Sequence, residues 1–488
     1  MLEYLQYING EWRRGTSARS DENINPANYE EILGTAKLAS KGDTIDAILA
    51  AKKALPAWKA LPGPKRGQIL FKFQRLLERD TEALARMLTQ EEGKILRESR
   101  GEVQKAINIV EFQAGEGRRW GGITRGSELP NNFCYTLKQP RGVVAVITPW
   151  NFPVAIPVWK LVAALVTGNT CIFKPASLTP ACAVKLVQLL EEAGVPAGVV
   201  NLVIGSGSEV GNTLVNAPDV HAVTFTGSNE IGLQLYIDAA KRGIPVQCEM
   251  GGKNALVVLK DADLNLAAEA TIQGAYGSTG QRCTATSRVV VEEPVADAFR
   301  KLLIEKMDKI VVGDGLDERT TMGPAVDRNQ FETVLRYIMT GEEQAELVKG
   351  GKEIYGMKGF FLQPTLFDQV DSQMIIAQEE IFGPVLSMIR VKDFEAALKA
   401  ANDSRYGLSS SVYTNDNAKI FRFINEIQTG ITHVNSPTMG GEAHLPFGGM
   451  KATGVGHREI NEEALEFFTE TKTVYIDYTG SKREGNLY

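Results

Sequence analysis

The stretch "TCIFKPASLTPACAVKLVQLLEEAG" (170–194) holds a short apolar run, a turn rich in Pro and Ser, and an amphipathic segment of helix length. This order predicts a strand, a turn and a helix. The neighbouring stretches "GVVAVITPWNFP" (142–153), "GVVNLVIGSGSEVGNTLVNAP" (198–218) and "VHAVTFTGSNEIGLQLYIDAA" (220–240) follow the same pattern. Regular alternation with short connections predicts a parallel, doubly wound α/β sheet, which binds ligands at the carboxyl ends of its strands.

The pattern extends on both sides of these units. The segment from Asp43 to Gln113 is mainly amphipathic helix, and after about Gly252 the alternation starts afresh. There it predicts a helix at Leu264–Gly277, a strand at Ser287–Val291 and a helix from Val295. The sequence therefore predicts a second α/β domain.

Composition narrows the class of protein. The chain has 488 residues, 43% hydrophobic and 23% charged, with a net charge of −6. These values are typical of a globular protein with more than one domain. The weakly acidic balance argues against a broad nucleic-acid or anionic-membrane surface. The run Gly142–Trp159 carries no charge, but three prolines interrupt it, so we expect a buried strand and helix rather than a membrane span.

The reactive residue types point to a reducing compartment. Five cysteines without a CxxC pair fit free thiols rather than a disulfide framework. The start "MLEYLQYINGEW" has no secretory signal pattern, so we expect a cytoplasmic protein. The four histidines show no metal-ligand spacing, and we expect no metal.

Several polar residues follow predicted strands, where a doubly wound sheet binds its ligand. Asn151 can donate to a developing oxyanion or cap the next helix. Lys174 lies where a nucleotide ribose or phosphate would lie, or is a surface lysine. Gly227 permits a turn that places Ser228 at a helix N-terminus, where it can meet a pyrophosphate or only cap the helix. Glu249, before a Gly-Gly pair, is a general base with raised pKa or part of a buried ion pair.

Two further motifs are less decisive. The turn "IGSGSEVG" (204–211) has the spacing GxGxxxG rather than GxGxxG, and glycines for a tight turn explain it equally well. In "GSTGQRCTATSR" (277–288), Cys283 lies in a small, polar, glycine-flanked segment. A free cysteine is more often a buried small residue than a nucleophile, so the residue alone does not decide.

Six motifs together do decide. "PWNFP", "FTGS", "EMGGKN", "GQRC", "EEIFGP" and "PFGGMKATG" occur in the order and approximate spacing of the aldehyde dehydrogenase superfamily. The resemblance extends from "YINGEW" to "ETKTVYI", nearly the whole chain. Within the superfamily, "GQRCTATSR" and "GGEAHLPFGGMKATGVGHRE" look most like the α-ketoglutaric semialdehyde (2,5-dioxopentanoate) dehydrogenases. A broad-range or a succinate-semialdehyde dehydrogenase is the alternative.

The resemblance implies roles for three catalytic residues. Cys283 matches the nucleophile that forms a thiohemiacetal and then a thioester. Asn151 and the Cys283 backbone N–H match the oxyanion donors. Glu249 matches the base that activates the hydrolytic water. Members that release the thioester to coenzyme A lack this glutamate, and structural or binding members have lost catalytic residues, so both of these readings are disfavoured.

The resemblance also implies a dinucleotide site. Its cofactor-binding positions are Trp150, Lys174, Ser177, Gly227, Ser228, Glu380 and Phe382. Many NAD-preferring members carry a glutamate where this chain has Ser177. Without a carboxylate to repel a 2′-phosphate, we expect NADP to be accepted, alongside NAD.

The substrate tunnel is implied by family position. Phe152, Trp159 and Phe447 match its aromatic lining. Arg282, immediately before the nucleophile, would suit a distal carboxylate, or it lies in a structural ion pair.

By resemblance the chain has a Rossmann-like cofactor domain (1–117 and 141–251) and an α/β catalytic domain (252–450). A small β bridging element, 118–140 and 451–488, completes it. The alternating tail "FFTETKTVYIDY" predicts a strand that adds to a partner's sheet, giving a homodimer or homotetramer.

Overall fold

The first sheet is built from the strand–turn–helix units of the sequence. The computed structural model describes residues 2–480. Eight strands lie in the order β22-β12-β11-β8-β9-β10-β2-β3, and the five from β12 to β10 are parallel. Their bounds are β2 Gln6–Ile8, β3 Glu11–Arg13, β8 Val143–Ile147, β9 Thr170–Lys174, β10 Val200–Leu202, β11 Ala222–Thr226, β12 Val246–Glu249 and β22 Gly454–Val455.

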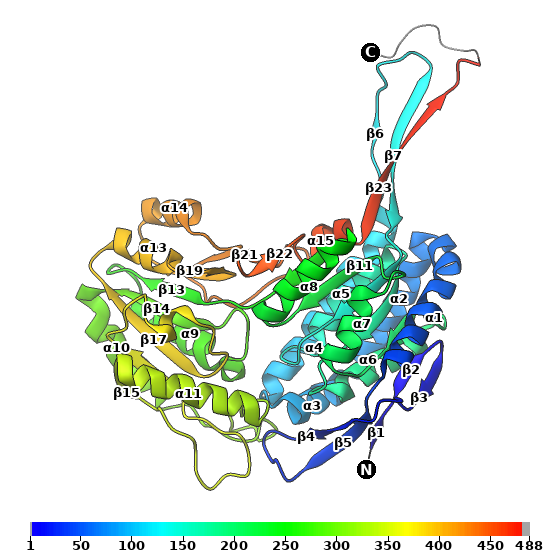
Figure 1. The fold of residues 1–488 in the computed structure, drawn as a ribbon. Coiled ribbons are helices and arrows are strands. Elements are labelled where there is room, and N and C mark those ends of the chain that lie inside the picture. The colour runs from blue at the N-terminus through cyan, green and yellow to red at the C-terminus, as the bar shows by residue number, and fades with distance from the viewer. Residues whose placement is uncertain (1, 481–488) are drawn as a thin grey trace.

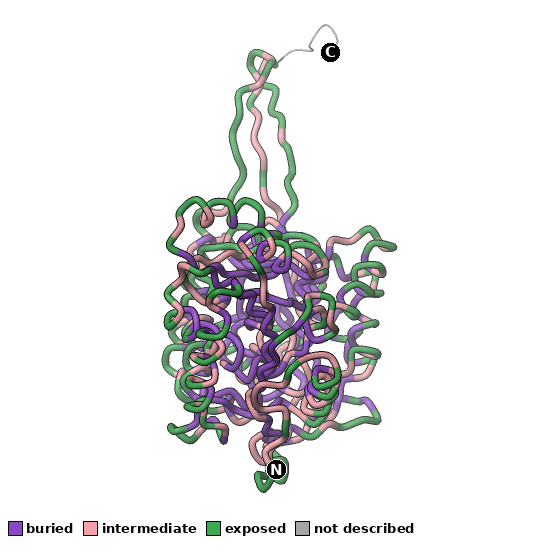
Figure 2. Tube along the Cα trace, turned by 90° about the vertical axis from the view of Figure 1, so that its left-hand side faces the viewer, coloured by how far each residue is buried: buried purple, intermediate pink, exposed green. Residues whose placement is uncertain are grey.

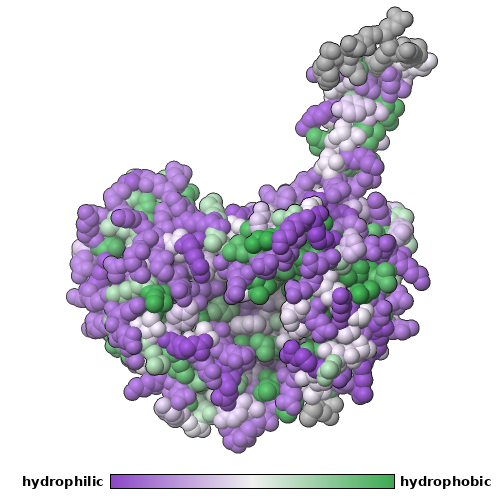
Figure 3. Space-filling view, viewed as in Figure 1, coloured by the Kyte–Doolittle hydropathy of each residue, from purple (hydrophilic) through white to green (hydrophobic). Residues whose placement is uncertain are grey.

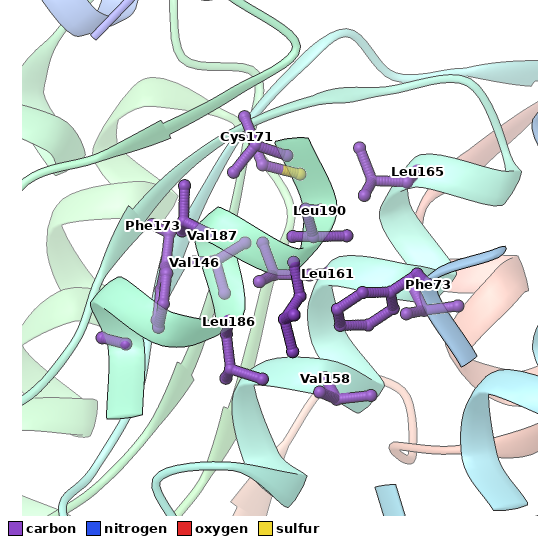
Figure 4. Packing of buried hydrophobic residues seen from close by; sticks show 14 of the residues in the cluster. Phe73, Val146, Val158, Leu161, Leu165, Cys171, Phe173, Leu186, Val187 and Leu190 are labelled. Atoms are coloured by element: carbon purple, nitrogen blue, oxygen red, sulfur yellow. The ribbon is translucent and has the colours of Figure 1, made fainter. Parts of the chain in front are cut away.

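Helices cover both faces of this sheet (Figure 1). Strand β8 shows why: Val144 and Val146 pack into one hydrophobic cluster, whereas Val143, Ala145 and Ile147 pack into another on the opposite face. Figure 4 shows Val146 and Phe173 of the sheet beside Leu161, Leu186 and Phe73 of three helices. The helices of this unit are α1 Lys41–Ala60, α2 Gly63–Arg79, α3 Thr81–Glu92, α4 Leu96–Arg119, α5 Ala155–Val166, α6 Pro180–Ala193, α7 Asn212–Asn216, α8 Asn229–Arg242 and α15 Asn461–Phe467.

A second α/β unit is present, as predicted. Its seven strands lie in the order β15-β16-β17-β14-β13-β19-β20, and only the edge strand β15 is antiparallel to its neighbour. Their bounds are β13 Asn254–Val258, β14 Thr286–Glu292, β15 Glu346–Lys349, β16 Thr365–Asp368, β17 Val385–Val391, β19 Ser409–Tyr413 and β20 Ile431–Val434. The helices are α9 Leu264–Tyr276, α10 Glu293–Met307, α11 Arg328–Gln344, α12 Ile375–Gln378, α13 Phe394–Asn402 and α14 Asn417–Glu426.

A narrow three-stranded sheet projects from this body (Figures 1 and 2). It consists of β6 Thr124–Arg125, β7 Asn132–Pro140 and β23 Thr469–Asp477, in the order β23-β7-β6. Two small sheets complete the fold, β1 Glu3–Tyr4, β5 Ile32–Lys37 and β4 Ser20–Ile24, and β18 Tyr406–Gly407 with β21 Met450–Lys451.

The expected bridging segments thus supply this projecting sheet, but the tail also contributes β22 and α15 to the first unit. Residues 481–488 of the expected tail lie outside the described residues. Between the two α/β units the molecular face is hollowed (Figure 3). The carboxyl ends of β8, β9, β11 and β12 meet at one edge of the first sheet, since Ile147 pairs with Lys174 and Thr226 with Glu249.

Candidate active site

A strained turn precedes Cys283. Ser278, Thr279 and Gly280 all have positive φ, 47°, 58° and 69°. A β-branched threonine rarely adopts this conformation, so surrounding contacts must hold it. The Ser278 N–H donates to Glu98 Oε1 at 2.8 Å, and Thr279 Oγ1 donates to the Gly323 carbonyl at 2.9 Å.

Cys283 itself is fixed through its backbone. Asn254 Nδ2 donates to the Cys283 carbonyl at 2.8 Å. A Cβ atom on Gly252 would lie 2.6 Å from that carbonyl oxygen, so only glycine allows this approach. Burial and, next, Glu380 raise the pKa of the Cys283 thiol to about 12, although Lys105 acts to lower it. The thiol is therefore neutral at pH 7 in the free protein.

Asn151 lies beside this loop. Its side chain is buried, and Nδ2 donates to the Gln281 carbonyl at 3.1 Å. Lys94 Nζ donates to the Asn151 carbonyl at 2.6 Å and to Glu102 Oε2 at 2.8 Å. Glu102 Oε1 in turn accepts from the backbone at the start of α5. A buried ion pair thus anchors the segment that carries the amide.

Glu249 ends β12 and is buried. The Gly449 N–H donates to its Oε2 at 3.3 Å, and a Cβ on Gly448 would lie 2.3 Å from Oε1. Burial raises the pKa of Glu249 well above its ordinary value, and Glu459 raises it further. Glu249 also raises the pKa of Cys283, so the two groups lie within electrostatic range. Asn151, Cys283 and Glu249 are thus brought to one region.

The predicted cofactor residues line the same edge of the first sheet. Lys174 is buried, its Nζ donates to the Pro175 carbonyl at 3.4 Å, and burial lowers its pKa to about 8. Ser177 is half-buried three residues on. After Gly227, Ser228 is exposed at the N-terminus of α8, and its side chain makes no capping hydrogen bond. A hydroxyl and free helix N–H groups at this place fit a pyrophosphate.

The second unit contributes Glu380 and Phe382. The Gly252 N–H donates to Glu380 Oε1 at 2.8 Å, and burial raises the pKa of Glu380 to about 7. Phe382 has a φ of 57°, rare for a bulky side chain, and its ring meets Trp150 edge-on with centroids 5.4 Å apart. A carboxylate for ribose hydroxyls, an amine for the second ribose and an aromatic pair between the units fit a nicotinamide dinucleotide.

The aromatic residues expected at the tunnel gather beside the thiol. Phe152, Trp159 and Phe447 belong to one hydrophobic cluster with Cys283, and the rings of Trp159 and Phe447 have centroids 5.6 Å apart. Arg282 forms an ion pair: its guanidinium donates to Glu98 Oε1 at 3.0 Å and to Ser278 Oγ at 2.9 Å. The ion pair named as one alternative for Arg282 is thus present in the structure, where the guanidinium also lies 5.7 Å from the Phe152 ring centroid.

Some site residues escaped the sequence analysis. Lys105 of α4 lies over the rings of Trp159 and Phe447, yet in the sequence it is one lysine of an amphipathic helix. Lys160 and Glu459 form a buried ion pair beside Thr224. A lone lysine in the apolar run "AIPVWKLVAALV" (155–166) was the available signal for that pair.

The glycine-rich motif at 204–211 lies in a turn. The "IGSGSEVG" stretch forms a loop and a short turn of π-helix, in which the Ser206 hydroxyl accepts from the Glu209 N–H. Among residues 2–480, no helix is long and apolar enough to cross a membrane, and no three His, Cys, Asp or Glu side chains cluster as metal ligands.

Comparison with known proteins agrees with this geometry. The aldehyde dehydrogenase family model matches residues 12–474. The chain is 45% identical to the α-ketoglutaric semialdehyde dehydrogenase of Bacillus subtilis, covering 97% of this chain and 98% of that one. It is 44% identical to the 2,5-dioxopentanoate dehydrogenase of Saccharolobus solfataricus, covering 97% and 99%.

Solved structures support the same assignment. The betaine aldehyde dehydrogenase of Staphylococcus aureus, in complex with NAD⁺, superposes with a TM-score of 0.95 at 34% identity, covering 98% of this chain and 95% of that one. Fold, site and similarity therefore agree: the chain belongs to the aldehyde dehydrogenase family and is an NAD(P)-dependent aldehyde dehydrogenase.

Proposed function

We propose that this enzyme oxidises an acidic semialdehyde, such as 2,5-dioxopentanoate, to the carboxylic acid, with Cys283 as nucleophile. The observation that carries the proposal is the meeting of Cys283, Asn151 and Glu249 beside one aromatic cluster. The substrate class is supported by the similarity to the B. subtilis and S. solfataricus semialdehyde dehydrogenases.

The first step uses the thiol and the amide. The Cys283 thiol gives up its proton to water, its sulfur bonds to the aldehyde carbon, and the carbonyl oxygen becomes an oxyanion. Asn151 has two N–H donors; one is used by the Gln281 carbonyl, so the other remains for the oxyanion, together with the Cys283 backbone N–H. Such a donor contributes about 10²–10³ in rate.

The second step uses Glu249. Lys174 and Glu380 would hold a nicotinamide dinucleotide, which would take up the hydride from the substrate carbon. The substrate then remains on Cys283 as a thioester. Glu249 takes a proton from water, the oxygen bonds to the acyl carbon, and the carbon–sulfur bond breaks to release the acid. Glu249 thus favours hydrolysis over transfer to coenzyme A.

The cofactor proposal rests on Ser177. This half-buried residue follows Lys174 by three positions and carries no charge. Because no carboxylate stands there to repel a 2′-phosphate, we propose that NADP is accepted alongside NAD.

One panel tests substrate and cofactor together. The purified enzyme is assayed with 2,5-dioxopentanoate, succinic semialdehyde and pentanal, each with NAD and with NADP. The highest kcat/KM is expected for 2,5-dioxopentanoate. Equal kcat/KM values for all three would show a broad-range enzyme instead, and NADP activity below about a thousandth of NAD activity would contradict the role of Ser177. Cys283→Ala is the inactive control.

A further inference from the structure

A hollow of about 840 Å³ opens between α4 and the loop 441–444. Lys105 lines it, and its ammonium lies over the rings of Trp159 and Phe447, with Nζ 5.3 Å and 5.5 Å from the ring centroids. Those rings pack in the same cluster as Cys283. Lys105 therefore stands where the hollow meets the apolar surroundings of the thiol.

Lys105 has no conventional partner. Within residues 2–480, no hydrogen bond or ion pair is formed by its Nζ, although Glu102 lies within electrostatic range. Burial lowers the pKa of Lys105, with Arg282 adding to the effect. The aromatic faces attract the ammonium but do not neutralise it. Lys105 is half-buried and unpaired, and a carboxylate that enters the hollow would pair with its ammonium.

Two other cations lie near the Phe152 ring, and both are paired with carboxylates. The Arg282 guanidinium lies 5.7 Å from the Phe152 ring centroid but is paired with Glu98 at 3.0 Å. Lys94 Nζ lies 3.9 Å from the centroid of the same Phe152 ring and is paired with Glu102 at 2.8 Å. An incoming carboxylate would compete with Glu98 or Glu102 at these residues. Glu111 and Glu442 also line the hollow, but among residues 2–480 neither forms an ion pair with Lys105.

We propose that Lys105, rather than Arg282, binds the distal carboxylate of the substrate. The inference rests on the proposed function and specifies its substrate class: an aldehyde joined to a carboxylate by a short uncharged chain. Such a chain would lie along Trp159 and Phe447, with its aldehyde at Cys283 and its carboxylate at the Lys105 ammonium. Lys105 is thus a specificity-determining residue.

The test compares a charged and an uncharged aldehyde of equal chain length in Lys105→Met. We expect kcat/KM for 2,5-dioxopentanoate to fall about 10- to 100-fold, mainly through KM, because a charge-assisted hydrogen bond is lost. For pentanal a smaller loss is expected, because the variant then loses only the effect of Lys105 on the Cys283 thiol. Lys105→Arg is expected to restore most of the loss, since a guanidinium also pairs with a carboxylate.

Three outcomes separate the possibilities. Equal losses for both aldehydes in Lys105→Met would overturn the inference, because the lysine would then act only on the Cys283 thiol. A selective loss in Arg282→Met but not in Lys105→Met would overturn it in favour of Arg282. If the unaltered enzyme itself shows no preference for 2,5-dioxopentanoate over pentanal, the proposed function fails first. Lys72→Met, an exposed lysine on α2, is the matched control for removal of a positive charge.

Discussion

At the scale of single residues, the surroundings of Cys283 favour its neutral thiol over the thiolate. The Cys283 thiol has a pKa of about 12 because burial and the carboxylates Glu380 and Glu249 oppose the thiolate. Of the causes acting on it, only Lys105 favours the charged form. Positive charge near the sulfur therefore favours the reactive thiolate.

Glu249 provides the residue-scale prediction. In Glu249→Gln the first hydride transfer should persist as a burst of reduced cofactor, because Cys283 and Asn151 remain. Steady-state turnover should fall about 10²–10⁴-fold, since thioester hydrolysis loses its base. The base form of Glu249 is lost as pH falls through its raised pKa, so the native rate should decline at a pH well above 4.5, whereas the variant should lack that limb. Stopped-flow absorbance and a pH profile measure both; equal loss of burst and turnover would contradict this role.

At the scale of elements, local pattern was enough for most of the fold. The helix predicted at Leu264–Gly277 is α9, Leu264–Tyr276, and the strand predicted at Ser287–Val291 is β14, Thr286–Glu292. Each has the period or apolar run of its class. Strand β22, Gly454–Val455, was not predictable: it has two residues and exists only because β12 offers an unpaired edge. Such non-local pairing leaves no periodic signal in the sequence.

The same limit applies to the site. Motif positions led to Cys283 and Glu249, but the charge partners of Arg282 and Lys105 depend on which side chains the folded helix α4 presents. Glu98 and Lys105 lie seven residues apart on this helix, on one face. Only the packing of α4 against the segment that carries Cys283 shows that Glu98 is paired and Lys105 is not.

The element-scale prediction concerns the buried pair that ties α5 to the tail. Both side chains of Lys160 and Glu459 are 1% exposed; Lys160 donates to the Thr224 hydroxyl, and the Thr226 hydroxyl donates to Glu459 Oε1. Glu459→Gln leaves a buried ammonium without a charge partner and should lower the free energy of unfolding by about 3–5 kcal/mol. Lys160→Met/Glu459→Gln should recover part of this loss. Urea unfolding at one protein concentration measures it.

The matched control for this pair is an exposed one. Glu82→Gln breaks the surface contact with Arg100 and should leave the urea midpoint nearly unchanged. A shift in Glu459→Gln no larger than that in Glu82→Gln would show that the buried pair adds no stability.

At the scale of the whole molecule, the projecting sheet is the feature that the single chain leaves uncovered. Phe133 and Leu137 of β7 and Ile476 of β23 are 47%, 40% and 45% exposed. Phe133, Tyr135 and Leu137 share one face with Val474 and Ile476, because Phe133 pairs with Ile476 and Tyr135 with Val474. An apolar face and an edge strand with no further strand beside it among residues 2–480 favour a second copy as the cover.

The last prediction tests that cover without breaking the sheet. In Phe133→Glu/Ile476→Lys the two new charges lie directly across β7 and β23 and attract each other, so the strands should stay paired. The apolar face, however, becomes charged, and association that buries it should be lost. Light scattering is expected to give a dimer or tetramer for the native chain and a monomer for the variant. Met339→Lys on α11, where the methionine is 63% exposed, should keep the native mass. A variant that also keeps it would place the contact between copies on another surface of the body.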